Sequence, residues 1–310
     1  MSEENTQQGG EESEAVETLS CCASCGIAKA KVDDIQLVPC DDCDLVRYCS
    51  DECRAQHKST HEEECKKRTA ELRDELLFKQ PESSHLGDCP ICCLPLPPDD
   101  PAKTTVAMCC SKTVCNGCRH ASDMRQFEQR LEGTCPFCRD SLPNNDEDGD
   151  QRRMKRIEAN DPVAIFHEGG EQYQKGNYSK AYEYWAKAAA LGDAWSHNRL
   201  AHLYHNGEVV EKDEGKAIYH WEEAAIGGHP EARYNLGCME WNNGNDERAV
   251  NHWIIAATHG YDDSIKALMR GFKYGYVEKE ELAAALRAHQ AAVDATKSPM
   301  RKEAEKYCFS

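Results

Sequence analysis

The sequence predicts two small cysteine-rich α+β fingers followed by an all-α solenoid of helical repeats. Two observations lead to this fold class. Of the 19 cysteines in the 310-residue chain, 17 lie between residues 21 and 138. From about residue 161 onward the chain is rich in alanine, and tryptophan, alanine and glycine recur with a spacing typical of stacked helix pairs.

Composition narrows the class of protein. The formal net charge is −18, so binding to a nucleic-acid backbone is not expected. No run approaches the roughly 18 consecutive apolar residues of a transmembrane helix, so we expect no membrane contact. Residues 1–20 hold six Glu and no Lys or Arg, which predicts a disordered acidic tail and no secretory signal. An intracellular protein, cytoplasmic or nuclear, keeps its thiols reduced, so clustered cysteines indicate metal binding rather than disulfides.

The first cysteine cluster has the spacing of two metal sites. Zn²⁺ takes four thiolate or imidazole ligands in a tetrahedron, so eight ligands make two sites. Residues four apart share one face of a helix, and we expect this of Cys49 with Cys53 and of His61 with Cys65. His57 is four residues from both Cys53 and His61 and is an alternative to His61. The candidate ligands are Cys22, Cys25, Cys40, Cys43, Cys49, Cys53, His61 and Cys65.

With the run Tyr-Cys-Ser-Asp-Glu-Cys at residues 48–53, this cluster resembles a MYND finger, here spanning residues 21–65. The resemblance implies a protein-interaction module that docks short, often proline-containing peptides. It also implies interleaved sites, with one zinc ion on Cys22, Cys25, Cys49 and Cys53, and the other on Cys40, Cys43, His61 and Cys65. A helical connector is expected at residues 66–88, because leucines recur at helical spacing before Pro81.

The second cysteine cluster, residues 89–139, resembles a RING finger in an all-cysteine variant. Lys112 stands where the family has a histidine, so the adjacent Cys109 and Cys110 would supply both central ligands. Their exact roles stay open, and His120 is a remote alternative. The two fingers together would bind about four zinc ions. The cross-brace pattern of the family would place one ion on Cys89, Cys92, Cys115 and Cys118, and the other on Cys109, Cys110, Cys135 and Cys138.

A RING finger of this kind would act by binding. A RING ubiquitin ligase holds a ubiquitin-charged conjugating enzyme in a reactive pose and supplies no catalytic nucleophile. In the family, this contact involves an apolar residue in the first Cys-x2-Cys pair, a proline after the seventh ligand and a cation after the last. The corresponding residues here are Ile91, Pro136 and Arg139. A guanidinium suits the last role because it presents several rigid donors at once.

The second half of the chain repeats itself. Trp185, Trp221 and Trp253 are 36 and 32 residues apart, and an alanine pair and a glycine follow each at fixed offsets. In each unit the tryptophan and the alanines share one helix face, and the glycine ends the helix. This pattern resembles SEL-one-like repeats, relatives of the tetratricopeptide repeat. Closed by a capping helix, the array would span residues 161–296, and its curved surface would bind a partner.

Two further segments complete the predicted organisation. Residues 140–160, acidic and then basic, are predicted to be a linker, and residues 297–310 a C-terminal tail. The leading hypothesis is a zinc-dependent RING-type ubiquitin ligase that recruits a conjugating enzyme and binds substrate or scaffold proteins through the MYND finger and the repeats. The alternative is a non-catalytic zinc-dependent adaptor for protein–protein interactions. Whether the chain is an enzyme stays open at this point.

Overall fold

A computed structural model of the chain describes residues 22–25, 37–98 and 100–308. The predicted acidic tail and Cys21 lie outside these residues. The chain divides into two compact units, Met1–Leu77 and Phe78–Ser310.

The first unit contains a short hairpin and a long helix. Strands β1 (Val38–Pro39) and β2 (Arg47–Tyr48) pair in antiparallel fashion, and helix α2 spans Asp51–Phe78. Apart from Leu37 and Tyr48, the fully buried side chains of its core cluster are cysteines. So small an apolar core makes the fold of this unit dependent on its cysteines.

Helix α2 begins earlier than the leucine pattern indicates. The Oγ of Ser50 accepts a hydrogen bond from the backbone N–H of Cys53 at 3.3 Å. Asp51 and Glu52 lie in the first turn, next to the positive end of the helix dipole. These residues start the helix inside the finger, so a single helix carries ligands and then continues into the predicted connector.

A second cysteine-rich module opens the second unit. The 3-10 turn η2 (Pro101–Lys103) leads into β3 (Thr104–Ala107), which pairs antiparallel with β4 (Lys112–Cys115). Helix α3 (Asn116–Glu128) follows at once. Few apolar side chains are buried here, so cysteines again make up much of the core.

The predicted linker after this module contains a helix, α4 (Asp146–Glu158). Asn145 caps it by accepting a hydrogen bond from the backbone N–H of Asp148 at 2.8 Å. Acidic residues in the first turn and basic residues in the last complement the helix dipole, which explains why so polar a segment is helical. Arg153 donates to the buried carboxylate of Glu168 at 2.9 Å and ties α4 to the first repeat helix.

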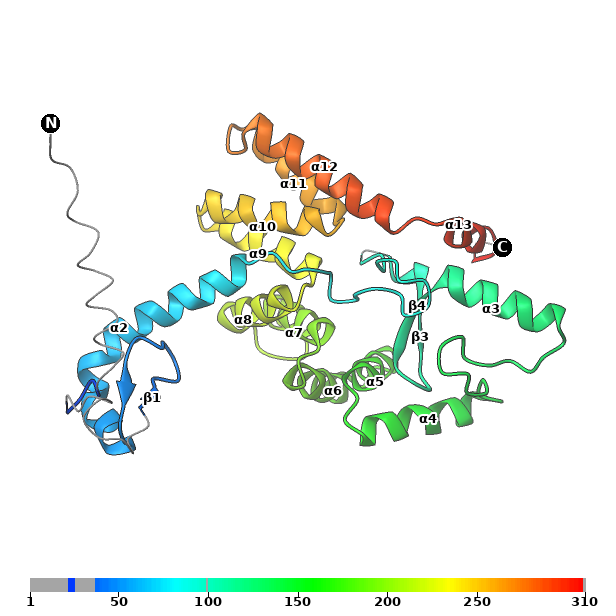
Figure 1. Ribbon diagram of the computed structural model, residues 1–310, viewed down its shortest axis with the longest axis horizontal. Coiled ribbons are helices and arrows are strands. Elements are labelled where there is room, and N and C mark those ends of the chain that lie inside the picture. Colours follow the sequence, from blue (N-terminus) through cyan, green and yellow to red (C-terminus); the bar gives the residue numbers. More distant parts are fainter. Residues whose placement is uncertain (1–21, 26–36, 99, 309–310) are drawn as a thin grey trace, which may run out of the picture. The chain divides into compact units, whose positions relative to one another are not determined.

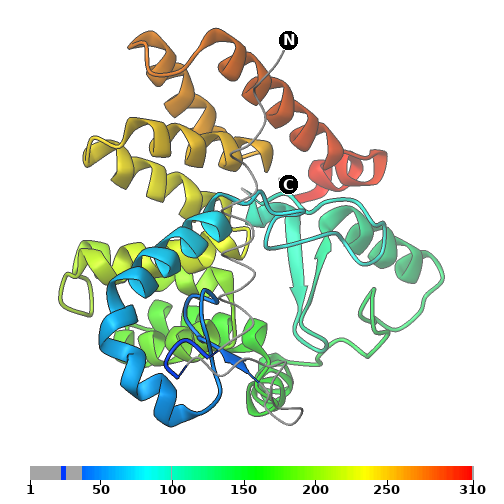
Figure 2. The ribbon, with the colours of Figure 1, turned by 60° about the vertical axis from the view of Figure 1, so that its left-hand side comes forward.

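The rest of the second unit is a stack of antiparallel helix pairs, which can be followed in Figures 1 and 2. The helices are α5 (Pro162–Gln174), α6 (Tyr178–Ala190), α7 (Ala194–Asn206), α8 (Glu214–Ile226), α9 (Pro230–Asn242), α10 (Asp246–Thr258), α11 (Asp262–Lys273) and α12 (Lys279–Ala295). The two helices of each pair pack against each other, and α6, α8 and α10 pack against the pair that follows, so the predicted all-α solenoid is confirmed. The predicted capping helix is α12.

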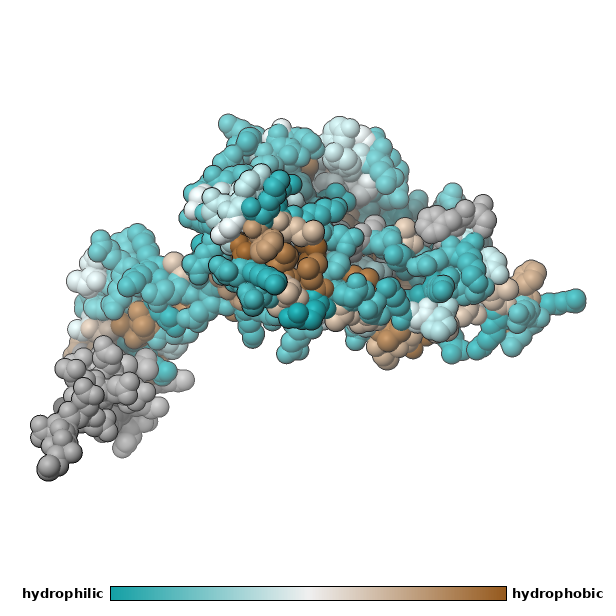
Figure 3. Space-filling model, turned by 90° about the horizontal axis from the view of Figure 1, so that it is seen from above, coloured by the Kyte–Doolittle hydropathy of each residue, from teal (hydrophilic) through white to brown (hydrophobic). Residues whose placement is uncertain are grey.

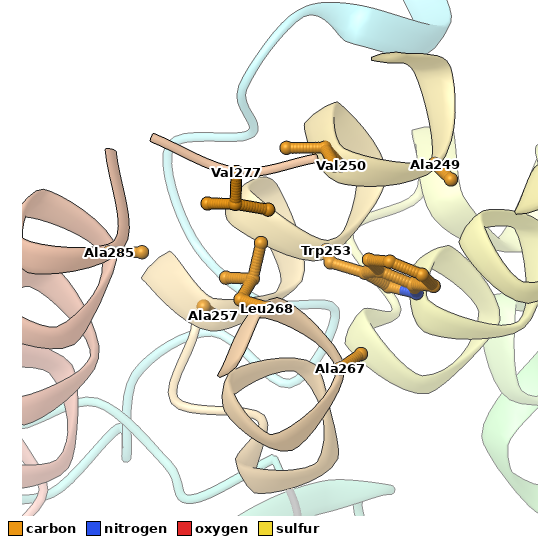
Figure 4. Close-up of a cluster of buried hydrophobic side chains, with 8 residues drawn as sticks. All are labelled: Ala249, Val250, Trp253, Ala257, Ala267, Leu268, Val277 and Ala285. Carbon is orange, nitrogen blue, oxygen red and sulfur yellow. The ribbon is translucent and has the colours of Figure 1, made fainter. Parts of the chain in front are cut away.

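One tryptophan of each repeat is buried at an equivalent place in the stack. Trp185, Trp221 and Trp253 lie in α6, α8 and α10, and the alanine pair that follows each is buried as well. Figure 4 shows Trp253 in the last of these clusters, where Leu268 and Val277 pack from α11 and the turn after it. The tryptophans and alanines therefore form the core, as the spacing predicts.

The predicted C-terminal tail contains a helix, α13 (Pro299–Cys308), which packs against α3 of the second module (Figure 1). Ala304 is buried, and the ring of Tyr307 stacks on that of His120 with centroids 4.6 Å apart. Because α3 lies far from α13 in the sequence, local sequence patterns do not predict this contact.

Polar side chains cover much of the surface. The face seen in Figure 3 is mostly hydrophilic, with hydrophobic patches set between polar side chains. None of the helices in the described residues combines the length and the hydropathy that crossing a membrane requires.

Candidate metal centres

Four groups of candidate ligands converge in the described residues. In each group the four ligand atoms lie within 4.8 Å of one another, and the groups are those that the interleaved and cross-brace patterns predict. Two belong to the first unit and two to the second module. We call them tetrad 1 (Cys22, Cys25, Cys49, Cys53), tetrad 2 (Cys40, Cys43, His61, Cys65), tetrad 3 (Cys89, Cys92, Cys115, Cys118) and tetrad 4 (Cys109, Cys110, Cys135, Cys138).

The sulfur spacings fit a tetrahedral zinc site. Four sulfurs at about 2.3 Å from one ion are about 3.8 Å apart. The Sγ atoms of Cys25 and Cys49 are 3.6 Å apart in tetrad 1, and those of Cys92 and Cys115 are 3.8 Å apart in tetrad 3. A disulfide needs sulfurs about 2.05 Å apart, so these pairs are not disulfides. The donor chemistry and the geometry both suit Zn²⁺.

The imidazole of tetrad 2 comes from His61. Its Nε2 lies 3.1 Å from the Sγ of Cys43, and the side chain is buried. The alternative, His57, instead places Nδ1 3.1 Å from the hydroxyl of Tyr48. The structure thus brings His61 rather than His57 to the cysteines.

The helix expected to carry both spaced pairs carries only one in full. His61 and Cys65 lie one turn apart on α2, as predicted. Cys49 precedes the first residue of α2, so it does not share a helix face with Cys53. Its Sγ is nevertheless 3.6 Å from that of Cys53, because the chain turns into the helix at Ser50.

A common backbone turn follows four of the cysteine pairs. Asp44, Cys93, Ser111 and Arg139 each follow the second cysteine of a pair, and each has a left-handed backbone with φ between 50° and 70°. In every case the residue donates its backbone N–H to the carbonyl four residues earlier. This shared turn brings the paired sulfurs together.

The shared turn also explains the adjacent cysteines of tetrad 4. The N–H of Ser111 donates to the carbonyl of Ala107 at 2.7 Å, so Ala107 stands where the other turns have their first cysteine. Cys109 supplies the missing sulfur, 3.4 Å from that of Cys138, and the Sγ of Cys110 is 4.0 Å from that of Cys135. His120, the remote alternative, stacks on Tyr307 instead of joining the tetrad.

The thiols of each tetrad differ in acidity, with at least one pKa lowered and another raised. Burial raises the pKa of Cys22, but backbone N–H groups of Cys25, Cys49 and Ser24 outweigh it and lower the pKa to about 6. Hydrogen bonding to the thiols of Cys25 and Cys53 raises the pKa of Cys49 to about 12. Such closely spaced thiols cannot all ionise by themselves, and a bound dication removes that restriction.

The three residues predicted to contact a conjugating enzyme lie beside tetrads 3 and 4. Ile91 is 40% exposed, Pro136 is half-buried, and Arg139 is exposed at its left-handed turn position. Sequence reasoning did not find Arg301, whose guanidinium donates to the Sγ of Cys92 at 3.5 Å. In the sequence, Arg301 is one of several cations in the predicted C-terminal tail, and nothing there links it to the cysteines.

Comparisons with known proteins identify two parts of the chain. The model of the MYND finger matches residues 22–65, and that of the Sel1 repeat matches residues 163–193, 196–229 and 230–261. No curated protein sequence matches the chain. No family match identifies the second cysteine-rich module as a RING finger.

Two solved structures are similar to part of the chain. A Sel1 repeat protein from Oxalobacter formigenes is 25% identical, and the match covers 39% of this chain and 96% of that one with a TM-score of 0.36. The protein c5321, a protective antigen of uropathogenic Escherichia coli strains with an SLR fold, is 24% identical. That match covers 55% of this chain and 36% of the antigen, with a TM-score of 0.39. From the family matches and the tetrads, the chain contains a MYND finger at residues 22–65 and Sel1 repeats at residues 163–261, with two all-cysteine tetrads between them.

Proposed function

We propose that the protein is a zinc-dependent scaffold that binds partner proteins through its MYND finger and its Sel1 repeats. The observation that carries the proposal is the coincidence of the MYND match with tetrads 1 and 2. MYND fingers bind zinc, and both MYND fingers and Sel1 repeats are protein-interaction modules. Structural zinc stabilises a small module by roughly 10 kcal/mol or more, so partner binding at the finger depends on the metal.

The surface of the MYND finger offers a site for a small apolar side chain. A cavity of about 170 Å³ lies beside the hairpin and is lined by Val38, Pro39, Tyr48, Ser50, Asp51 and Arg54. Val38 is 51% exposed there. A proline ring of an extended peptide matches a site of this size and character, which supports the peptide-docking role.

A second cavity supports partner binding in the repeat unit. It measures about 640 Å³ and is bordered by strand β3, the turn after it and helices α5 and α7. Phe166 and Trp195 line it, with ring centroids 6.0 Å apart, together with Arg199 and the acidic Asp88 and Asp193. Aromatic side chains and arginine are enriched at protein-binding surfaces.

The test is an array of short peptides in which each proline-containing sequence is paired with its alanine counterpart, probed with the zinc-loaded full-length chain. Peptides that bind are then titrated by fluorescence anisotropy. We expect Cys40→Ser, which removes a ligand of tetrad 2, and Val38→Glu, which changes only an exposed side chain, to weaken binding at least about tenfold. Cys93→Ser removes a thiol outside the tetrads and should bind like the wild type. Equal binding by Cys40→Ser would contradict the proposal.

The finer hypothesis, a RING-type ubiquitin ligase, is a second candidate function. It is supported by the cross-brace grouping of tetrads 3 and 4 and by two exposed apolar side chains, Ile91 in the first Cys-x2-Cys pair and Phe137 in the last. A conjugating enzyme would be the partner at this surface. In a reconstituted auto-ubiquitination assay with a panel of conjugating enzymes, Ile91→Ala and Arg139→Ala should lose activity while they keep their zinc. A folded, zinc-loaded wild type that is silent with every conjugating enzyme leaves the scaffold as the function.

A further inference from the structure

The C-terminal helix α13 lies directly on the first turn of α3, beside two ligands of tetrad 3. A Cβ atom on Gly117 would lie 2.7 Å from the backbone nitrogen of Arg301 and 2.9 Å from its Cα. Gly117 stands between Cys115 and Cys118 in the sequence. The backbone of α13 therefore contacts the ligand-bearing turn directly, and no residue larger than glycine fits at position 117.

The side chain of Arg301 extends from this contact to a third ligand of the same tetrad. Its Nη2 donates to the Sγ of Cys92 at 3.5 Å and to the carbonyl of Leu94 at 3.0 Å. Its Nη1 donates at 2.6 Å to the carbonyls of Pro95 and Thr296. These carbonyls, from the ligand loop and from the segment after α12, hold the guanidinium in one orientation with its charge beside a ligand sulfur.

The negative charge of a zinc-bound tetrad explains why a cation is favourable at this position. Four thiolates around one Zn²⁺ carry a net charge of about −2, which hydrogen-bond donors and cations stabilise. The backbone N–H groups of Cys115 and Cys118 donate to ligand sulfurs at 3.4 Å. Arg301 adds a full positive charge, and its acceptors among the described residues are carbonyls and this sulfur rather than a carboxylate.

We propose that Arg301 stabilises the zinc-bound form of tetrad 3, so that zinc binding in the second module and docking of α13 are coupled. The inference rests on the proposed binding of zinc by that module. Coupling of this kind is reciprocal: docked α13 slows the loss of zinc, and bound zinc holds α13 in place. A contact 209 residues apart in sequence thereby makes the C-terminal helix part of the metal centre.

The experiment follows each cysteine of the zinc-loaded full-length chain during a challenge with EDTA. Thiols freed of zinc are alkylated with N-ethylmaleimide, and peptide mass spectrometry gives the rate at each position. In Arg301→Met we expect Cys92 and Cys115 to be alkylated about tenfold faster than in the wild type, with Cys135 of tetrad 4 unchanged. Arg301→Lys should show a smaller increase, because lysine keeps the charge but not the planar fork.

Two control variants separate the charge from the packing of α13. Lys302→Met removes the neighbouring exposed cation, and Tyr307→Ala removes the ring stack with His120. Lys302→Met should leave the rate at Cys92 close to the wild-type rate, and Tyr307→Ala, which loosens α13 but keeps the guanidinium, should raise it clearly less than Arg301→Met does. The proposal is overturned if Arg301→Met is alkylated at the wild-type rate, or if Tyr307→Ala accelerates Cys92 as much as Arg301→Met does. A wild type that holds no zinc at Cys92 would instead refute zinc binding by the module.

Discussion

Gly169 on α5 lies so close to Trp185 on α6 that a Cβ atom on the glycine would be 2.5 Å from the indole Nε1. The same relationship recurs two repeats later between Gly237 and Trp253, again at 2.5 Å. Because each glycine lacks a side chain, the edge of the tryptophan ring packs directly against the backbone of the helix that carries the glycine. The register of one helix on its partner follows from this contact.

The glycine contact predicts opposite effects for two adjacent substitutions. Gly169→Ala places a methyl group against the indole and should destabilise the array by about 1 to 3 kcal/mol. Gly170→Ala, its neighbour on α5, meets nothing within 4 Å and should be neutral or stabilise by up to about 1 kcal/mol, because alanine favours helix. Urea unfolding of the zinc-loaded chain, followed by circular dichroism, measures both. Equal stabilisation by both substitutions would contradict the contact.

The middle repeat is the exception and leads to a second prediction. His205 stands where the other repeats have the glycine, and the Nε1 of Trp221 is buried with no hydrogen-bond partner among the described residues. In contrast, the Nε1 of Trp185 donates to the carbonyl of Phe166 at 3.2 Å. Trp185→Phe should therefore cost about 1 kcal/mol more than Trp221→Phe. Both variants lose the same volume, so the difference between their unfolding free energies reports the hydrogen bond; no difference would refute its contribution.

A histidine whose ring nitrogens are buried should make the second unit sensitive to acid. The ring of His85 stacks on that of His229 at 4.2 Å and meets Trp195 edge-on, and burial lowers the pKa of His85 to about 4 from a usual 6.5. Because the folded state disfavours the proton, the stability from neutral His85 is complete above about pH 6.5 and is lost as the pH falls toward 4. His229, Glu231 and His259 are the other titratable groups beside this ring.

The substitution His85→Phe isolates this effect. Phenylalanine keeps the ring packing but cannot be protonated, so its stability should fall less than that of the wild type between pH 6.5 and 4, by roughly 1 to 3 kcal/mol. Unfolding midpoints in urea across this range provide the measurement. Identical pH profiles for the two proteins would show that His85 does not titrate as described.

The adjacent cysteines of tetrad 4 lead to a stoichiometric prediction. Cys110→Ser should lower the zinc content by about one ion, because three remaining ligands bind zinc weakly. Cys93→Ser and His120→Ala should leave it unchanged, since neither residue lies in a tetrad. Native mass spectrometry counts the ions in each variant. Loss of zinc from His120→Ala would return the histidine to the ligand set.

Much of this structure could be predicted because its signals are local and periodic. The tryptophan and alanine spacing shows the repeats directly, and the paired cysteines show where ligands gather. The sequence also predicts that the adjacent Cys109 and Cys110 both serve as ligands. The reason lies in the backbone turn at Ser111, in which Ala107 takes the place of the first cysteine, and the sequence does not reveal this turn.

The features that sequence reasoning did not find depend on contacts between distant residues or on capping. Helix α4 is polar apart from Gly149, Met154 and Ile157 and suggests a linker, although Asn145 and the order of charges at its ends indicate a helix. Helix α13 is short, and the helix against which it packs, α3, lies far before it in the sequence. The roles of Arg301 and Gly117 therefore depend on the packing of α13 against α3, which the sequence does not show.

Zinc content is the most direct test, because the proposed interaction surfaces of the MYND finger and of the second cysteine-rich module depend on the metal. Native mass spectrometry of the full-length chain, purified without added chelator, gives the number of bound ions, and elemental analysis identifies the metal. The account predicts four zinc ions per chain, one for each tetrad. A value near two would show that one of these two modules does not bind zinc, and a value near zero would contradict the zinc-dependent scaffold.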